Sequence, residues 1–261
     1  MNYLPALMAS LLISSICLSQ ECGPGYTEIN ELCFHDGDLN VLQKMIDNSY
    51  QSGIDLGCQE DAPYCGSPNP FMDDQDSWMG IAVDGAPYEW NANGNGIVEP
   101  LELGIQEWEN GRLTSLMCGA YIYCQLSGPI PDEIIELTEI ETLRLEINYL
   151  NGFIPDTICG LGLNYNDHLE FDISGNRLCP PYPDCIDIQG GPFWYQDTSQ
   201  CNQIGDINYD GSINILDVII LISSIVSSEN IDFQALMISD TNADGQLDVL
   251  DVVELINTII G

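Results

Sequence analysis

Apolar residues recur at a regular spacing through residues 126–178. The segment "LSGPIP" at 126–131 returns 24 residues later as "LNGFIP" at 150–155, and a partial third copy, "LEFDISGNRLCPPYP", follows. Such a period predicts stacked coils, each of which turns its aliphatic side chains inward, with Asn148 bonding the backbone of a bend. The side chains expected in this core are Leu137, Ile140, Leu143, Leu145, Leu150, Ile154 and Ile158.

The repeated segment fits the pattern L-x-x-L-x-x-L-x-L-x-x-N-x-L-x-G-x-I-P and resembles the plant-type leucine-rich repeat. This resemblance implies a short α/β solenoid over 113–188, behind a disulfide-rich N-terminal cap over 20–112. In such a cap "DLNVLQKMIDN" is an amphipathic helix, and "WENGRLTSLMC" leads into the first coil. Six alternating strand residues would face a concave surface, as a ligand site or as an ordinary solvated face: Thr142, Arg144, Glu146, Glu170, Asp172 and Ser174.

A second repeat lies near the carboxyl end, where residues 206–217 and 240–251 place oxygen-bearing side chains at alternate positions before a sharp turn at glycine. An apolar stretch typical of a helix follows each loop. Six to eight oxygen ligands at this spacing are what Ca²⁺ takes, whereas softer metals prefer thiols or imidazoles. The predicted ligands, with the carbonyl at the seventh position, are Asp206, Asn208, Asp210, Ser212 and Asp217, and Asp240, Asn242, Asp244, Gln246 and Asp251.

A weaker version of the same loop occupies residues 91–102. Its oxygen donors would be Asn91, Asn93, Asn95, the carbonyl of Ile97, and Glu102. Neutral Asn replaces the usual Asp, and fewer charges mean weaker calcium binding. The alternative is a turn rich in Asn and Gly that holds no metal.

No helix is expected before the first of the two strong loops, and both loops carry Asp at the twelfth position. In these two features they resemble a type I dockerin, which is a small all-α domain of two loop-helix repeats. The resemblance covers residues 205–261, with residues 189–204 as a linker or packed connector. It implies a protein partner of the cohesin type, often beside polysaccharide-degrading enzymes. Ile215-Leu216 and Val249-Leu250 stand where well-known dockerins carry polar residues. These apolar pairs would either meet a partner, or complete an internal core or dock onto the solenoid.

The first residues predict export. Residues 4–19 are apolar, uncharged and too short for a membrane span, so residues 1–19 are expected to be a secretory signal peptide, with an uncleaved anchor as the alternative. Ten cysteines follow. Their close spacings favour the local disulfides Cys22/Cys33, Cys58/Cys65, Cys118/Cys124 and Cys179/Cys185, and they do not follow a zinc-site pattern.

The balance of basic and acidic residues limits the kinds of partner that the chain can bind. Four basic residues oppose 41 acidic ones, for a formal net charge of −37, so a nucleic acid would be repelled. The chain carries no nucleophile elbow, P-loop, dinucleotide fingerprint or zinc-protease helix. We therefore expect a secreted or cell-surface calcium-binding adaptor without catalytic residues or a membrane span in its mature form. Its repeats would bind a glycan or peptide ligand. The alternative is an accessory component of a polysaccharide-degrading assembly, or a glycoside hydrolase within one.

Overall fold

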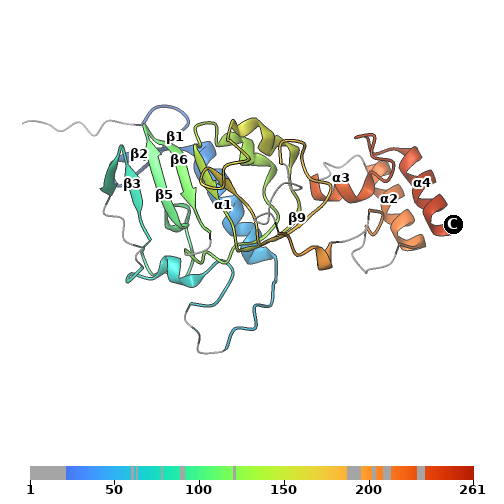
Figure 1. Ribbon diagram of the computed structural model, residues 1–261, viewed down its shortest axis with the longest axis horizontal. Helices are drawn as coiled ribbons and strands as arrows, with labels where there is room; N and C mark the ends of the chain where they lie inside the picture. Colours follow the sequence, from blue (N-terminus) through green and yellow to red (C-terminus); the bar gives the residue numbers. More distant parts are fainter. Residues whose placement is uncertain are drawn as a thin grey trace, which may run out of the picture.

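The computed structural model describes residues 22–59, 62, 64–77, 79–88, 92–119, 122–186, 195–201, 204–207, 213–227 and 233–261. The expected signal peptide lies outside these residues. Figure 1 shows a sheet that contains β3, β5 and β6 at one end of the molecule and the helices α2, α3 and α4 at the other. Within the described residues, no helix is long and apolar enough to cross a membrane.

The amino-terminal half is built on helix α1 (Asp36–Gln51) and a six-stranded sheet. The apolar face of α1, with Val41, Leu42, Met45 and Ile46, is buried, which confirms the expected amphipathic helix. A separate hairpin pairs β1 (Tyr26–Ile29) with β2 (Leu32–His35). The sheet has the order β10-β8-β6-β5-β3-β4 and consists of β3 (Ile81–Val83), β4 (Ala86–Tyr88), β5 (Ile105–Glu109), β6 (Arg112–Met117), β8 (Thr142–Arg144) and β10 (Phe171–Asp172).

Successive copies of the apolar repeat form parallel strands. Leu143 of β8 pairs with Leu116 of β6 on one side and with Phe171 of β10 on the other. A second parallel sheet lies on the same coils and consists of β7 (Ser127–Gly128), β9 (Tyr149–Phe153) and β11 (Arg177–Cys179). All seven aliphatic side chains expected in the core are buried there. The short 3-10 helices η3 (Asp132–Glu136) and η4 (Asp156–Leu161) complete the coils.

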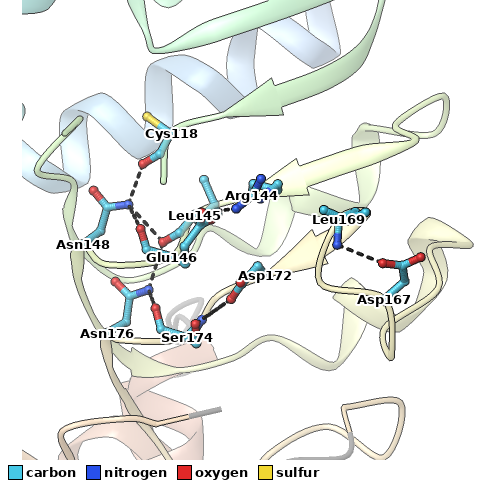
Figure 2. Close-up of polar contacts among 10 residues, drawn as sticks. All are labelled: Cys118, Arg144, Leu145, Glu146, Asn148, Asp167, Leu169, Asp172, Ser174 and Asn176. Carbon is cyan, nitrogen blue, oxygen red and sulfur yellow. Dashed lines mark hydrogen bonds and ion pairs between the residues drawn. The ribbon is translucent and has the colours of Figure 1, made fainter. Parts of the chain in front are cut away.

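Two buried asparagines join neighbouring coils, as the sequence pattern predicts for Asn148. The Asn148 amide donates to the carbonyls of Cys118 at 2.7 Å and Leu145 at 2.9 Å, and its Oδ1 accepts from Leu126 N at 2.9 Å. Asn176 repeats the arrangement one coil later, donating to the Leu145 carbonyl at 2.9 Å. Figure 2 shows both amides directed at these backbone groups. Each side chain satisfies polar atoms that the bend removes from water, so it contributes to stability.

Five disulfides are present in the described chain. Cys22–Cys33, Cys58–Cys65 and Cys118–Cys124 confirm three expected pairs. The expected pair Cys179/Cys185 is wrong, because Cys185 joins Cys159 and Cys179 joins Cys201. The coil brings Cys159 of η4 beside Cys185, whereas residues 195–201 return to β11, where the amide of Asp197 donates to the Asn176 carbonyl. Spatial neighbours, and not sequence neighbours, decide these two bonds.

The carboxyl-terminal helices are α2 (Ile215–Ser227), α3 (Phe233–Ser239) and α4 (Val249–Ile260). Helices α2 and α4 pack on each other through the buried side chains Val218, Leu221, Val252 and Leu255. Helix α3 instead lies against the coils, where Ile238 packs with Phe153 and Cys179. Figure 1 shows α3 beside β9. Helix α3 and the strands β9 and β11 therefore share a packed contact.

Burial of Leu145 gives a test of the coil core. Leu145→Ala should lower the free energy of unfolding by about 2 to 5 kcal/mol, because Leu145 is fully buried and its removal leaves a cavity. Leu169 is 62% exposed in the next coil, so Leu169→Ala should change it by less than about 0.5 kcal/mol. Urea unfolding of both variants measures the difference. Similar costs for the two would contradict the placement of Leu145 in the core.

Candidate functional site: acidic loops and an apolar helix surface

The loop 240–251 is folded around its own carboxylates. Asp240 Oδ2 accepts from Gly245 N at 2.8 Å, and its Oδ1 accepts from Asp244 N at 3.1 Å. Asp251 Oδ1 accepts from Asn242 N at 3.3 Å, so the first, third, fifth and twelfth positions lie on one compact turn. Gly245 has φ +79°, a conformation that glycine adopts without steric cost. The turn therefore brings four of the predicted ligand positions onto one loop, where their side-chain oxygens accept from backbone amides.

Asp248, at the ninth position of the second loop, caps the helix that follows the loop. Its Oδ1 accepts from Leu250 N at 2.7 Å, and together with Asp251 it forms a capping box at the start of α4. Asn214 holds the matching position in the first loop, where its Oδ1 accepts from Leu216 N at 2.9 Å. Each helix thus begins inside its loop, because the ninth residue supplies the N-cap.

The first loop is described only at its ends. Asp206 and Asp217 are buried, and Asp217 accepts from Ile207 N and Asn214 N at 2.8 Å each. The predicted ligands Asn208, Asp210 and Ser212 lie outside the described residues. The two ends of the loop are therefore held together by one buried carboxylate.

Three carboxylates of this module, Asp206, Asp217 and Asp251, are each no more than 2% exposed. The sequence has no Lys or Arg after Arg177, so no cationic side chain of the module can balance them. Buried charge without a counter-charge is costly, and a cation from solution would remove that cost. Among the described residues, no three His, Cys, Asp or Glu side chains converge as a metal cluster. The donor set fits Ca²⁺ through its mixture of carboxylate, amide and carbonyl oxygens.

The weaker loop at 91–102 gains charge from elsewhere in the fold. Asp73, buried at the end of η1 (Pro70–Asp73), accepts from the amides of Gly94, Asn95 and Gly96 at 2.6 to 3.2 Å. Glu99 accepts from the Asn93 amide at 2.7 Å, and Glu102 of η2 (Pro100–Glu102) accepts from Asn93 N. Asn91 lies outside the described residues, and Ile97 is exposed. The sequence pattern did not identify Asp73 or Glu99, and Asp73 is too distant in sequence for any loop pattern to include it.

Burial raises the pKa of Glu102 to about 7, and the charges of Asp73 and Glu99 add to this effect. With calcium chelated, the unfolded chain ionises from pH 4.5 while the folded chain keeps its proton, so stability should fall by roughly 1 to 3 kcal/mol as pH rises from 4.5 to 7. Glu102→Gln should flatten this slope, and Glu107→Gln, at an exposed site on β5, should not. Urea unfolding at several pH values in chelator measures both. Equal slopes in wild type and Glu102→Gln would contradict the assignment.

The six polar residues expected on a concave face are not an open surface. Glu146 and Asp172 are buried, and the other four are partly covered. Arg144 pairs with Glu146 two residues along the chain, and Asp172 accepts from the Ser174 hydroxyl at 2.6 Å (Figure 2). These side chains therefore contact one another, which alternation along the strand does not predict.

The apolar pairs on α2 and α4 are exposed. Ile215, Leu216, Val249 and Leu250 are each 52% to 65% exposed, so they neither complete the internal core nor lie on the coils. Further exposed aliphatic side chains continue along both helices: Ile219, Ile222, Val226, Val253 and Ile260. An apolar surface of this kind on a soluble module marks a site of association.

Comparison with known proteins agrees with this geometry at the carboxyl end. The family model of the dockerin type I domain matches residues 204–260. Among curated proteins, none matches the chain. A similar solved structure is the BIR3–SERK2 complex from Arabidopsis thaliana, with 17% identity, coverage of 60% of this chain and 92% of that chain, and a TM-score of 0.27. Residues 204–260, with their two acidic loops and exposed helix surface, are thus a dockerin type I domain.

Proposed function

We propose that this chain is a secreted, calcium-binding adaptor that attaches to a cohesin-type partner through its dockerin domain. The observation that carries this proposal is the exposed apolar surface formed by Ile215, Leu216, Val249 and Leu250. Each pair directly follows the N-cap of its helix. Ordering of an acidic loop therefore fixes the position of the adjacent apolar pair. Five disulfides support an extracellular location, because such bonds persist in oxidising compartments.

Calcium would be held by the predicted ligands of the two loops, with Asp206 and Asp217 in the first and Asp240, Asp244 and Asp251 in the second. A bound ion supplies the positive charge that the module lacks. Asp73, Glu99 and Glu102 support a third site at 91–102. The carboxylates of each loop already hold backbone amides, so they orient the turn for oxygen ligation.

The coils over 113–188 are proposed to be leucine-rich repeats that contact a glycan or peptide ligand. Support comes from the parallel strands of successive coils and from the buried Asn148 and Asn176 that join them. Because Arg144 pairs with Glu146 and Asp172 with the Ser174 hydroxyl, the proposed contact uses other parts of the coils. The chain is proposed to act by binding and not by catalysis.

A pull-down tests the attachment. The full secreted chain, immobilised in calcium, should capture a cohesin-bearing scaffold and release it in chelator. The double variant Leu216→Asp/Leu250→Asp should abolish capture, because charge at both sites opposes burial of the apolar surface. Leu169→Asp, at an exposed leucine on the coils, is the matched control. Capture that survives the double variant would show that another surface binds the partner.

A further inference from the structure

A cavity of about 310 Å³ opens on the amino-terminal half, far along the chain from the dockerin domain. It lies between two segments of the chain. Residues 64–71 precede the strands β3 to β6 in the sequence, and residues 122–125 follow them. Its lining residues are Tyr64, Asn69, Phe71, Ile122, Tyr123 and Gln125. None of them is charged. The volume is at the lower end of that of small-molecule sites, which suits one or two rings.

Two tyrosines present their rings to solvent at this cavity. Tyr64 is 52% exposed and Tyr123 is 59% exposed. Tyr64 packs edge-to-face on Phe71, with ring centroids 4.8 Å apart. This contact fixes the Tyr64 ring while leaving much of its surface open. Large aromatic surface held open at a concave site is what ligand pockets offer for stacking.

The backbone that carries Tyr123 is held in an uncommon conformation. Tyr123 and Gln125 have φ +56° and +53°, a region that residues with side chains rarely adopt. The buried amide of Asn69 donates to the Tyr123 carbonyl at 2.7 Å, and Asn69 N donates to the Cys124 carbonyl at 2.8 Å. Such strain persists only where the surroundings impose it, and it concentrates at ligand sites.

Disulfides fix both walls of the cavity. Cys118–Cys124 holds the loop of Tyr123 and Gln125, and Cys58–Cys65 holds the chain beside Tyr64. The lining is thus preformed, so a ligand pays little ordering entropy on binding.

The polar groups at the cavity are amides and hydroxyls. Gln125 Oε1 accepts from Gly66 N at 3.1 Å, which leaves its Nε2 without a hydrogen bond to the described residues. The Nε2 group can donate to a hydroxyl or ring oxygen. An anionic ligand would be repelled by the net charge of −37, and no lining carboxylate is present to hold a cation.

From these features we infer that the cavity binds a neutral sugar ring of a glycan. The apolar C–H face of a pyranose stacks on Tyr123 or Tyr64, and the Gln125 amide bonds one of its hydroxyls. A proline-rich peptide also docks on aromatic side chains, but it needs a groove that follows several residues at about 3.1 Å each. The compact cavity favours the sugar. Tyr123 and Gln125 lie within the coils over 113–188, so this inference rests on the ligand-binding role proposed for them and not on the dockerin domain.

Calorimetric titration of the full secreted chain with neutral hexasaccharides tests the site. The probes are hexamers of β-1,4-glucan, β-1,4-xylan, β-1,4-mannan and β-1,3-glucan, with decaproline as the peptide probe. At least one hexasaccharide should bind, and Tyr64→Ala or Tyr123→Gly should raise its Kd roughly tenfold or more. Tyr195→Ala, at a tyrosine that is 69% exposed elsewhere, should leave the Kd unchanged.

Tyr123→Gly separates binding from folding, because glycine adopts a positive φ freely and the variant keeps the backbone conformation. Its thermal midpoint should not fall below that of wild type. Absence of binding to all four hexasaccharides, equal weakening by Tyr195→Ala, or binding of decaproline alone would overturn the inference. Capture of a cohesin-bearing scaffold by the same variants should persist, so the two proposals fail independently.

Discussion

Asp38→Ala is expected to lower the free energy of unfolding of the amino-terminal half by about 3 to 5 kcal/mol. Asp38 is fully buried at the start of α1, and both its oxygens accept from the Arg112 guanidinium at 2.8 and 2.9 Å. It also accepts from Leu113 N at 2.9 Å, so one carboxylate fixes α1 to β6. Its loss leaves Leu113 N without its acceptor, and the Arg112 guanidinium loses this carboxylate while it keeps the Glu136 carbonyl and the Thr138 hydroxyl. Urea unfolding measures the cost.

Asp36→Ala is the matched control, since Asp36 lies exposed in the same first helical turn and accepts only from the Thr27 hydroxyl among the described side chains. It should cost about 1 kcal/mol or less. The double variant Asp38→Ala/Arg112→Ala should cost less than the sum of its single variants, because each single change leaves one buried charge uncompensated. Equal costs for Asp36→Ala and Asp38→Ala would contradict a stabilising role for this pair.

Calcium removal is expected to unfold the dockerin domain and leave the disulfide-held coils folded. Asp206, Asp217 and Asp251 are buried, and the sequence has no Lys or Arg after Arg177, so the apo form concentrates negative charge beside a small core. Each site filled at 100 times its Kd adds about 2.7 kcal/mol. Because α2 and α4 share one core, filling one loop should tighten the other. Far-UV circular dichroism in chelator should show loss of helix, and calcium should restore it.

The loops are expected to differ in affinity. The second offers a fourth carboxylate, Asp248, where the first has neutral Asn214, so Asp240→Ala should weaken calcium binding more than Asp206→Ala. Calorimetric titration of the full chain measures both. Glu254→Ala, at an exposed site on α4, is the control for loss of one negative charge. A helix content indifferent to chelator, or a larger effect of Asp206→Ala, would contradict this ranking.

The second loop is also joined to the coils. Asp240 directly follows α3, whose Ile238 packs on Phe153 and on the Cys179–Cys201 disulfide. Ile238→Ala should therefore reduce the stability of the dockerin domain in the full chain, although Ile238 is not a calcium ligand. An unchanged thermal midpoint would show that this contact carries no coupling.

Local periodicity was sufficient for much of this protein. Leu143 and Leu145 are buried and Asn148 bonds the backbone, as the spacing of the repeat predicts. The glycine turn and the N-caps of the loop-helix units can also be predicted from the sequence, because their hydrogen bonds join residues only a few positions apart. Three disulfides between near neighbours followed in the same way.

Tertiary structure decided what joins distant segments. Asp73 accepts from the loop 91–102, and Cys159 forms a disulfide with Cys185. Tyr64 and Tyr123 line the same cavity. No periodic pattern in the sequence predicts these contacts. The exposure of individual side chains also depends on the tertiary structure. The ion pair of Arg144 and Glu146 is largely covered, whereas Leu216 is exposed to solvent. Sequence spacing encodes which side of its own element a residue occupies. What covers that side depends on how the elements pack, and packing follows from the summed contacts of the whole chain.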